Sequence, residues 1–194
     1  MSTIWYEAVD EGFVKEIFKN VKYIDRNTGE PTPIPLDHII LNKPEDDYKN
    51  EVYPSVHITH LFETHDKMRY NPNQLIVGRD FEKNMAQMKD SPVPFNLFFQ
   101  LDFYSKFQTD INTMTSSWLK KHFRQFNLKV VDSENDEVTI NVMVNENMKS
   151  ADFLEGYERI YRRIISYRIW VELDDEIVYN VPMVKEVSVN TTKQ

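Results

Sequence analysis

The chain contains no cysteine among its 194 residues, which excludes disulfide scaffolds, cysteine nucleophiles and thiolate metal sites. Glycine is scarce: only four are present, and they form neither a phosphate-binding loop nor a dinucleotide-binding turn. The nucleophile motif Gly-x-Ser-x-Gly is missing as well. These absences argue against an enzyme, and we expect no cofactor.

Long apolar runs and an excess of positive charge are also missing. No apolar window approaches the ~20 residues that a membrane span needs. The N-terminus carries acids where a secretory signal would carry a basic segment, so we expect a soluble, cytoplasmically made protein. With 23 basic and 31 acidic residues the net charge is −8, which argues against broad binding to nucleic acid or anionic membranes. A content of 41% hydrophobic residues is sufficient for a folded core.

What the chain does have is a dense aromatic run, "PFNLFFQLDFYS", at residues 94–105. Its odd positions are all apolar: Phe95, Leu97, Phe99, Leu101 and Phe103. Its even positions are mixed: Asn96, Phe98, Gln100, Asp102 and Tyr104. A period of two predicts a strand with one buried face and one partly wet face.

At Asp110 the period changes to helical spacing, which runs to Phe123. We expect Asp110 to be the N-cap of this amphipathic helix. A second helix is predicted over residues 3–20, although Gly12 weakens its middle.

The remaining segments predict mainly strands. They comprise a strand–turn–strand unit at 21–41, a strand at 53–63, a hairpin at 126–146, and a strand from about Tyr161 that pairs through an Asp174-Asp175 turn with residues 176–189. The pattern at 151–163 fits either a helix or a strand. Periodicity fades between His65 and Asp90, so we expect an arm at about 64–92 that lies on a neighbour. The predicted fold is a single α+β domain over residues 1–194, with a mostly antiparallel sheet, an N-terminal helix and a central helix packed on it.

Two groups of residues suggest metal or acid–base chemistry, but ordinary roles are favoured. The first is a histidine cluster with nearby acids: His57, His60, Glu63, His65 and Asp66. On a strand, His57 and His60 face opposite sides, which does not suit a shared metal. The second comprises the acidic runs 45–47 and 174–176, which lie in predicted turns where acids are common. We therefore predict no catalytic or metal site, and a small metal-dependent enzyme that uses His57 and His60 remains the alternative.

Basic and aromatic residues alternate near the C-terminus: Tyr157, Arg159, Tyr161, Arg162, Arg163, Tyr167, Arg168 and Trp170. Such a pattern suits a nucleic-acid backbone or a subunit interface, and the acidic net charge favours the interface. On a strand, Arg162, Arg168 and Trp170 share one face. Phe98 and Tyr104 are large residues on the wetter face of the aromatic strand. The predicted subunit-interface residues are thus Phe98, Tyr104, Arg162, Arg168 and Trp170.

The order of these elements resembles that of bacteriophage tail-terminator proteins, the tail-completion or head–tail joining family. The resemblance rests on the N-terminal helix, "YPSVHI", "PFNLFFQLDFYSKFQTDINTMTSSWLKKHF", "RIYRRIISYRIWVEL" and a final hairpin that ends in "VPMVKEVSVN". The arm at 65–92 and the proline-rich hairpin at 26–36 depart from the family pattern.

The resemblance implies a structural virion protein without catalytic activity, made in the host bacterial cytoplasm. Such a protein forms a homo-oligomeric ring, a hexamer, that caps the tail tube and contacts tube, sheath and neck or connector proteins. DNA would pass through its lumen without sequence-specific binding. The alternative within the same class is another tail, neck or baseplate subunit.

Overall fold

The computed structural model describes residues 2–42, 52–83, 85–131, 137–173 and 178–182. The protein is mixed α+β with two α-helices and mostly antiparallel strands in this part, which confirms the predicted α+β class with a mostly antiparallel sheet. The chain divides into two compact units. The first comprises Met1–Thr64 and Asn96–Val171, and the second comprises His65–Phe95 and Glu172–Gln194.

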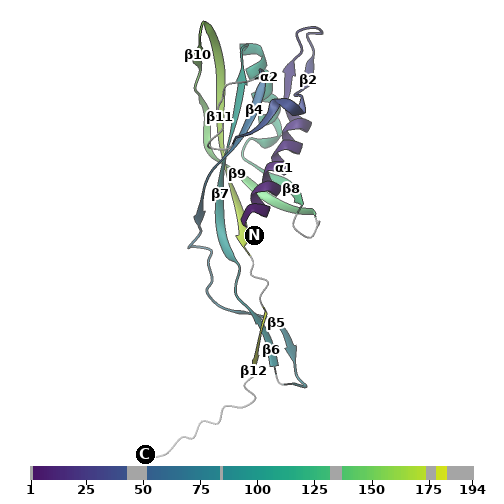
Figure 1. The fold of residues 1–194 in the computed structure, drawn as a ribbon, viewed down its shortest axis with the longest axis vertical. Helices are drawn as coiled ribbons and strands as arrows, with labels where there is room; N and C mark the ends of the chain where they lie inside the picture. The colour runs from purple at the N-terminus through teal and green to yellow at the C-terminus, as the bar shows by residue number, and fades with distance from the viewer. Residues whose placement is uncertain (1, 43–51, 84, 132–136, 174–177, 183–194) are drawn as a thin grey trace, which may run out of the picture. The chain divides into compact units, whose positions relative to one another are not determined.

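A seven-stranded sheet is the largest element (Figure 1). Its central order is β3 (Ile39–Asn42), β4 (Ser55–His65), β7 (Val93–Ser105), β11 (Glu158–Leu173), β9 (Glu137–Ser150) and β8 (Gln125–Val131), with β10 (Phe153–Glu155) paired to β11. β3 and β4 are parallel, whereas β8, β9, β10 and β11 pair in antiparallel fashion. The ambiguous segment 151–163 is therefore strand rather than helix, and its two strands turn at Gly156 with a φ of 60°.

The N-terminal helix α1 (Ser2–Asn20) brings Phe13 into the aromatic core. The Phe13 ring centroid lies 5.6 Å from that of Phe99 in β7 and 6.0 Å from that of Tyr167 in β11. Gly12 explains how the helix comes so close to the sheet. A Cβ at this position would lie 3.1 Å from the Leu128 side chain and from the Lys129 carbonyl oxygen of β8. The glycine that weakens the helix locally thus permits its close packing.

The second helix, α2 (Gln108–His122), begins earlier than predicted. Its N-cap is Phe107, and no side chain caps it. The prediction that Asp110 is the N-cap is therefore wrong: Asp110 lies in the first turn with its side chain turned into the protein. The reason is a competing partner, because Asp110 Oδ2 lies 2.7 Å from Nη2 of Arg26. Arg26 belongs to the turn between β1 (Lys22–Ile24) and β2 (Pro31–Pro33), which confirms the predicted strand–turn–strand unit. A short 3-10 helix, η1 (Leu36–His38), follows it.

The second unit contains a three-stranded antiparallel sheet in the order β12, β6, β5. Its strands are β5 (Leu75–Asp80), β6 (Met85–Lys89) and β12 (Val178–Pro182). β12 pairs with β6, from Val178 opposite Lys89 to Pro182 opposite Met85. The predicted pairing of this segment with the strand that ends near Leu173 is therefore wrong. The predicted turns with acidic runs at 45–47 and 174–176 lie outside the described residues.

Candidate functional site

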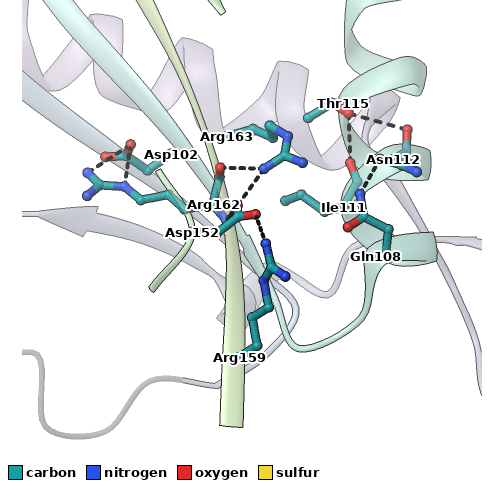
Figure 2. Close-up of polar contacts among 9 residues, drawn as sticks. All are labelled: Asp102, Gln108, Ile111, Asn112, Thr115, Asp152, Arg159, Arg162 and Arg163. Atoms are coloured by element: carbon teal, nitrogen blue, oxygen red, sulfur yellow. Dashed lines mark hydrogen bonds and ion pairs between the residues drawn. The ribbon is translucent and has the colours of Figure 1, made fainter. Parts of the chain in front are cut away.

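The arginines of the β10–β11 hairpin converge on one carboxylate. Asp152 accepts hydrogen bonds from Arg159 Nη2 at 3.1 Å, from Arg163 Nη1 at 2.7 Å and from the backbone nitrogen of Arg162 at 3.1 Å (Figure 2). Burial raises the pKa of Asp152, but these hydrogen bonds outweigh it and the net pKa is lowered. Two of the four arginines that the sequence placed near a partner are therefore engaged within the hairpin itself.

Arg162 forms its own pair with the next strand. Its Nε and Nη2 atoms donate to the same oxygen of Asp102 at 3.2 and 3.1 Å, as Figure 2 shows. Gln100 donates to the other Asp102 oxygen at 2.8 Å. Burial raises the pKa of Asp102, whose side chain is 3% exposed, while Gln100 and Arg162 oppose the rise. The pair ties β11 to β7 in a poorly solvated site, where a charge needs its partner.

The face of β7 that was predicted to be wet is buried at its C-terminal end. The Tyr104 ring lies 4.7 Å from the ring of His57 and 6.4 Å from that of Phe153, measured between centroids. The Arg162 guanidinium lies 5.3 Å from the Tyr104 ring. Asp102 and Tyr104 are therefore enclosed by neighbouring strands, and the expectation of a wet face is wrong at these two positions.

The other predicted interface residues lie nearer the surface. Phe98 is partly exposed and stacks on Phe62 with a centroid distance of 4.5 Å. Arg168 lies 5.5 Å above the ring of Trp170, which is 40% exposed. Of the five predicted interface residues, the structure thus places Arg162 near the ring of Tyr104 and Arg168 near the ring of Trp170.

One pair resembles a nucleophile with its base: Ser55 Oγ lies 3.2 Å from His57 Nε2. Burial, and secondarily the charge of Arg162, lower the pKa of His57 to about 4. Ser55 is 0% exposed, however, so a substrate has no access to its hydroxyl. The pair is a neutral, buried hydrogen bond in the sheet.

The histidines that were considered as a candidate metal cluster have separate surroundings. His60 Nε2 lies 3.6 Å from a Glu63 oxygen, the His65 ring contacts Phe95, and Asp66 pairs with Arg69 at 2.7 Å. Within the described ranges, no three histidine or acidic side chains are grouped so that they could hold a metal ion.

A cavity of about 270 Å³ lies in the first unit, where the β1–β2 turn meets the junction of β7 and α2. Its lining includes Tyr23, Arg26, Tyr53, Lys106, Phe107 and Asp110. Sequence reasoning missed these residues, because they come from segments far apart in the chain and share no motif. The aromatic and basic residues of the cavity make it a second candidate site, besides the arginine cluster.

Comparison with known proteins does not assign the chain to a family: no family model matches it, and no curated protein matches it. In the part of the chain that the structure describes, neither helix is long and apolar enough to cross a membrane.

Proposed function

We propose that this protein is a structural subunit that assembles with further copies of itself, and that the assembly is a ring at the end of a bacteriophage tail tube. The proposal assigns no catalytic role. The observation that carries it is the surface of β5, where Leu75, Ile76 and Val77 follow one another and all are exposed. Consecutive exposed apolar residues on a strand are unusual for a protein that stays monomeric.

The edge of β5 supports assembly through strand addition. β5 pairs with β6, and its other edge has no partner among the described strands. Its unpaired N–H and C=O groups can accept a strand from another chain. β12 lies at the opposite edge of the same small sheet. A ring needs two different complementary patches on each subunit, and two distinct sheet edges meet this requirement.

Three further features are consistent with the tail-ring proposal. The net charge of −8 suits a ring whose lumen lets DNA pass without gripping its phosphates. Trp170 is partly exposed beside Arg168, a combination that is frequent at interfaces. Aromatic side chains of both helices also lie near the aromatic strand on which the resemblance rests: Phe13 of α1 near Phe99 and Trp118 of α2 near Phe103, both in β7.

The proposal is tested by size-exclusion chromatography with light scattering and by negative-stain imaging. We expect closed rings of uniform size from the wild-type protein. Ile76→Glu places a charge on the β5 surface and is expected to shift the protein to monomers. Leu36→Glu is the matched control, since Leu36 is similarly exposed, at 58% against 52% for Ile76, but lies in η1. Trp170→Ala is expected to leave the fold intact and to weaken assembly.

The form of the assembly decides between the alternatives. A single ring supports the terminator role, whereas open tubes of variable length would identify a tube subunit. A protein that stays monomeric at every concentration, with no difference between wild type and Ile76→Glu, would contradict the proposal.

A further inference from the structure

The cavity beside α2 has two cations on its wall, and each lies over an aromatic ring. The guanidinium carbon of Arg26 is 3.8 Å from the ring centroid of Phe107, and Nζ of Lys106 is 5.4 Å from that of Tyr53. Aromatic faces favour such positions because the ring quadrupole attracts a cation. The two cations are thus held at the cavity wall.

Arg26 is fixed by bonds that use only part of its hydrogen-bonding capacity. Its Nη2 atom forms an ion pair with Asp110 Oδ2 at 2.7 Å and donates a hydrogen bond to Thr109 Oγ1 at 3.5 Å. No residue in the described part of the chain accepts a hydrogen bond from Nε or Nη1. A guanidinium carries five N–H donors in one plane, so several remain available. The Arg26 side chain is 46% exposed, which leaves these donors accessible.

Each of the two cations has a carboxylate partner, but these partners leave part of the cations' hydrogen-bonding capacity unused. Asp110 lines the cavity and its Oδ1 is buried without a hydrogen-bond partner, but its Oδ2 is occupied by the Arg26 ion pair and by a hydrogen bond from the Ser105 hydroxyl. Lys106 pairs with Glu158, whose side chain is well exposed and readily displaced. Asp25 is the remaining acid, and its Oδ1 accepts from the backbone nitrogen of Asn27 at 2.8 Å. The donors accessible from the cavity therefore favour an anionic ligand.

We propose that this cavity binds a carboxylate group, supplied by an acidic side chain of a protein partner or by a free small organic acid. The Arg26 fork donates to the carboxylate oxygens, Lys106 adds a second charge-assisted hydrogen bond, and Tyr23 and Phe107 contact the carbon atoms next to the carboxylate. Cavities for drug-sized ligands measure roughly 300 to 1,000 Å³. A volume of about 270 Å³ therefore suits a group of side-chain size. The proposal is independent of ring assembly.

The experiment is an NMR titration of the ¹⁵N-labelled full chain at low salt with three probes. Succinate represents a free acid, the peptide acetyl-Gly-Glu-Gly-amide represents an acidic side chain, and acetyl-Gly-Gln-Gly-amide is the uncharged control. We expect saturable shifts of the Tyr53 and Phe107 amide signals with succinate and the Glu peptide, and none with the Gln peptide. Tighter binding of the peptide assigns the site to a protein partner, and tighter binding of succinate assigns it to a small acid.

Three variants distinguish ligand binding at this cavity from a general effect of surface charge. Arg26→Lys keeps a cation beside Asp110 but removes the fork, and is expected to weaken binding at least about tenfold. Lys106→Gln is expected to weaken it severalfold. Lys129→Gln is the matched control, because Lys129 also pairs with an exposed acid, Glu137, but lies on β8 away from the cavity. Lack of saturable binding, equal binding of the Gln peptide, or the same affinity in both cavity variants would overturn the proposal.

Discussion

The indole nitrogen of Trp118 donates a hydrogen bond of 2.6 Å to the hydroxyl oxygen of Tyr167. Trp118 belongs to α2 and Tyr167 to β11, and both side chains are fully buried. The bond therefore links the central helix to the sheet inside the core, where an unpaired donor is costly.

Tyr167→Phe removes this acceptor and leaves the Trp118 N–H without a partner. We expect a loss of about 1 to 3 kcal/mol in the free energy of unfolding, measured by urea denaturation. Tyr161→Phe is the control, since Tyr161 lies on the same strand and is partly exposed. Equal stability of Tyr167→Phe and wild type would show that the hydrogen bond contributes nothing.

His57 is expected to make stability depend on pH. Its pKa is about 4 in the folded protein, below the ordinary value of 6.5, because of burial and the nearby Arg162. His57 therefore binds a proton more tightly in the unfolded chain than in the folded protein. The contribution of neutral His57 to the stability of the fold is complete above pH 6.5 and is lost as the pH falls toward 4. The loss amounts to up to about 3 kcal/mol.

His57→Gln isolates this effect. The pKa of His122 is also lowered by burial, so part of the same acid sensitivity should remain in the variant. Urea denaturation at neutral pH and near pH 4.5 gives the two stabilities of each protein. A variant that loses as much stability as wild type between these values would contradict the assignment to His57.

Asp10 is expected to change stability with pH in the opposite direction to His57. Burial, and secondarily the charge of Glu7, raise its pKa to about 6. Because the folded pKa lies above the ordinary value of 3.8, stability is lost as the pH rises from about 4 to 6, and the ionised group remains unfavourable at pH 7. Asp10→Asn is therefore expected to stabilise the protein at pH 7 by about 1 kcal/mol, after allowance for its partial exposure, with little effect near pH 4. Glu11→Gln, at an exposed position of the same helix, should show no such pH-dependent gain.

Gly12→Ala is expected to have two opposing effects on stability, one through helix propensity and one through packing. Alanine favours a helix interior by about 1 kcal/mol over glycine. Its Cβ, however, would meet the Lys129 carbonyl oxygen at 3.1 Å, and this backbone atom cannot rotate away. We expect a net loss of thermal stability, whereas Glu11→Ala on the exposed side should be neutral or slightly stabilising. A higher melting temperature for Gly12→Ala would mean that α1 moves outward at little cost.

The sequence predicted the elements whose pattern is local. The helix of residues 3–20, the helix predicted to begin at Asp110 and the aromatic strand were identified from local periodicity, and all three are present, although the second helix begins earlier, at Gln108. The expected buried face of β7 was right for Leu97, Phe99, Leu101 and Phe103, whereas Phe95 is only partly buried, and the expected wet face was wrong for Tyr104. Burial of Tyr104 depends on Phe153 and Arg162, which come from a hairpin some 50 residues later. A single strand's pattern does not contain this information.

The sequence did not predict the strand pairing partners or the candidate sites, for a related reason. Val178–Pro182 was assigned to the nearest preceding strand, but it pairs with β6, which lies almost 90 residues earlier. Strand pairing depends on which edge is available in space, and local alternation does not report it. Arg26 and Lys106 are likewise 80 residues apart in the sequence and line one cavity. Arg162 was predicted to lie at a subunit interface, and in the structure its guanidinium pairs with Asp102 of the same chain.

The open edge of β5 has a consequence for how the protein behaves when it is produced in excess. A strand that displays Leu75, Ile76 and Val77 beside an edge that no described strand covers is a template for uncontrolled strand addition as well as for ordered assembly. Arg79 and Asp80, at the end of β5, place opposite charges next to the apolar residues and limit how far such stacking can extend. Overproduced protein should therefore remain in solution longer when these two charges are kept, and their neutralisation should promote aggregation.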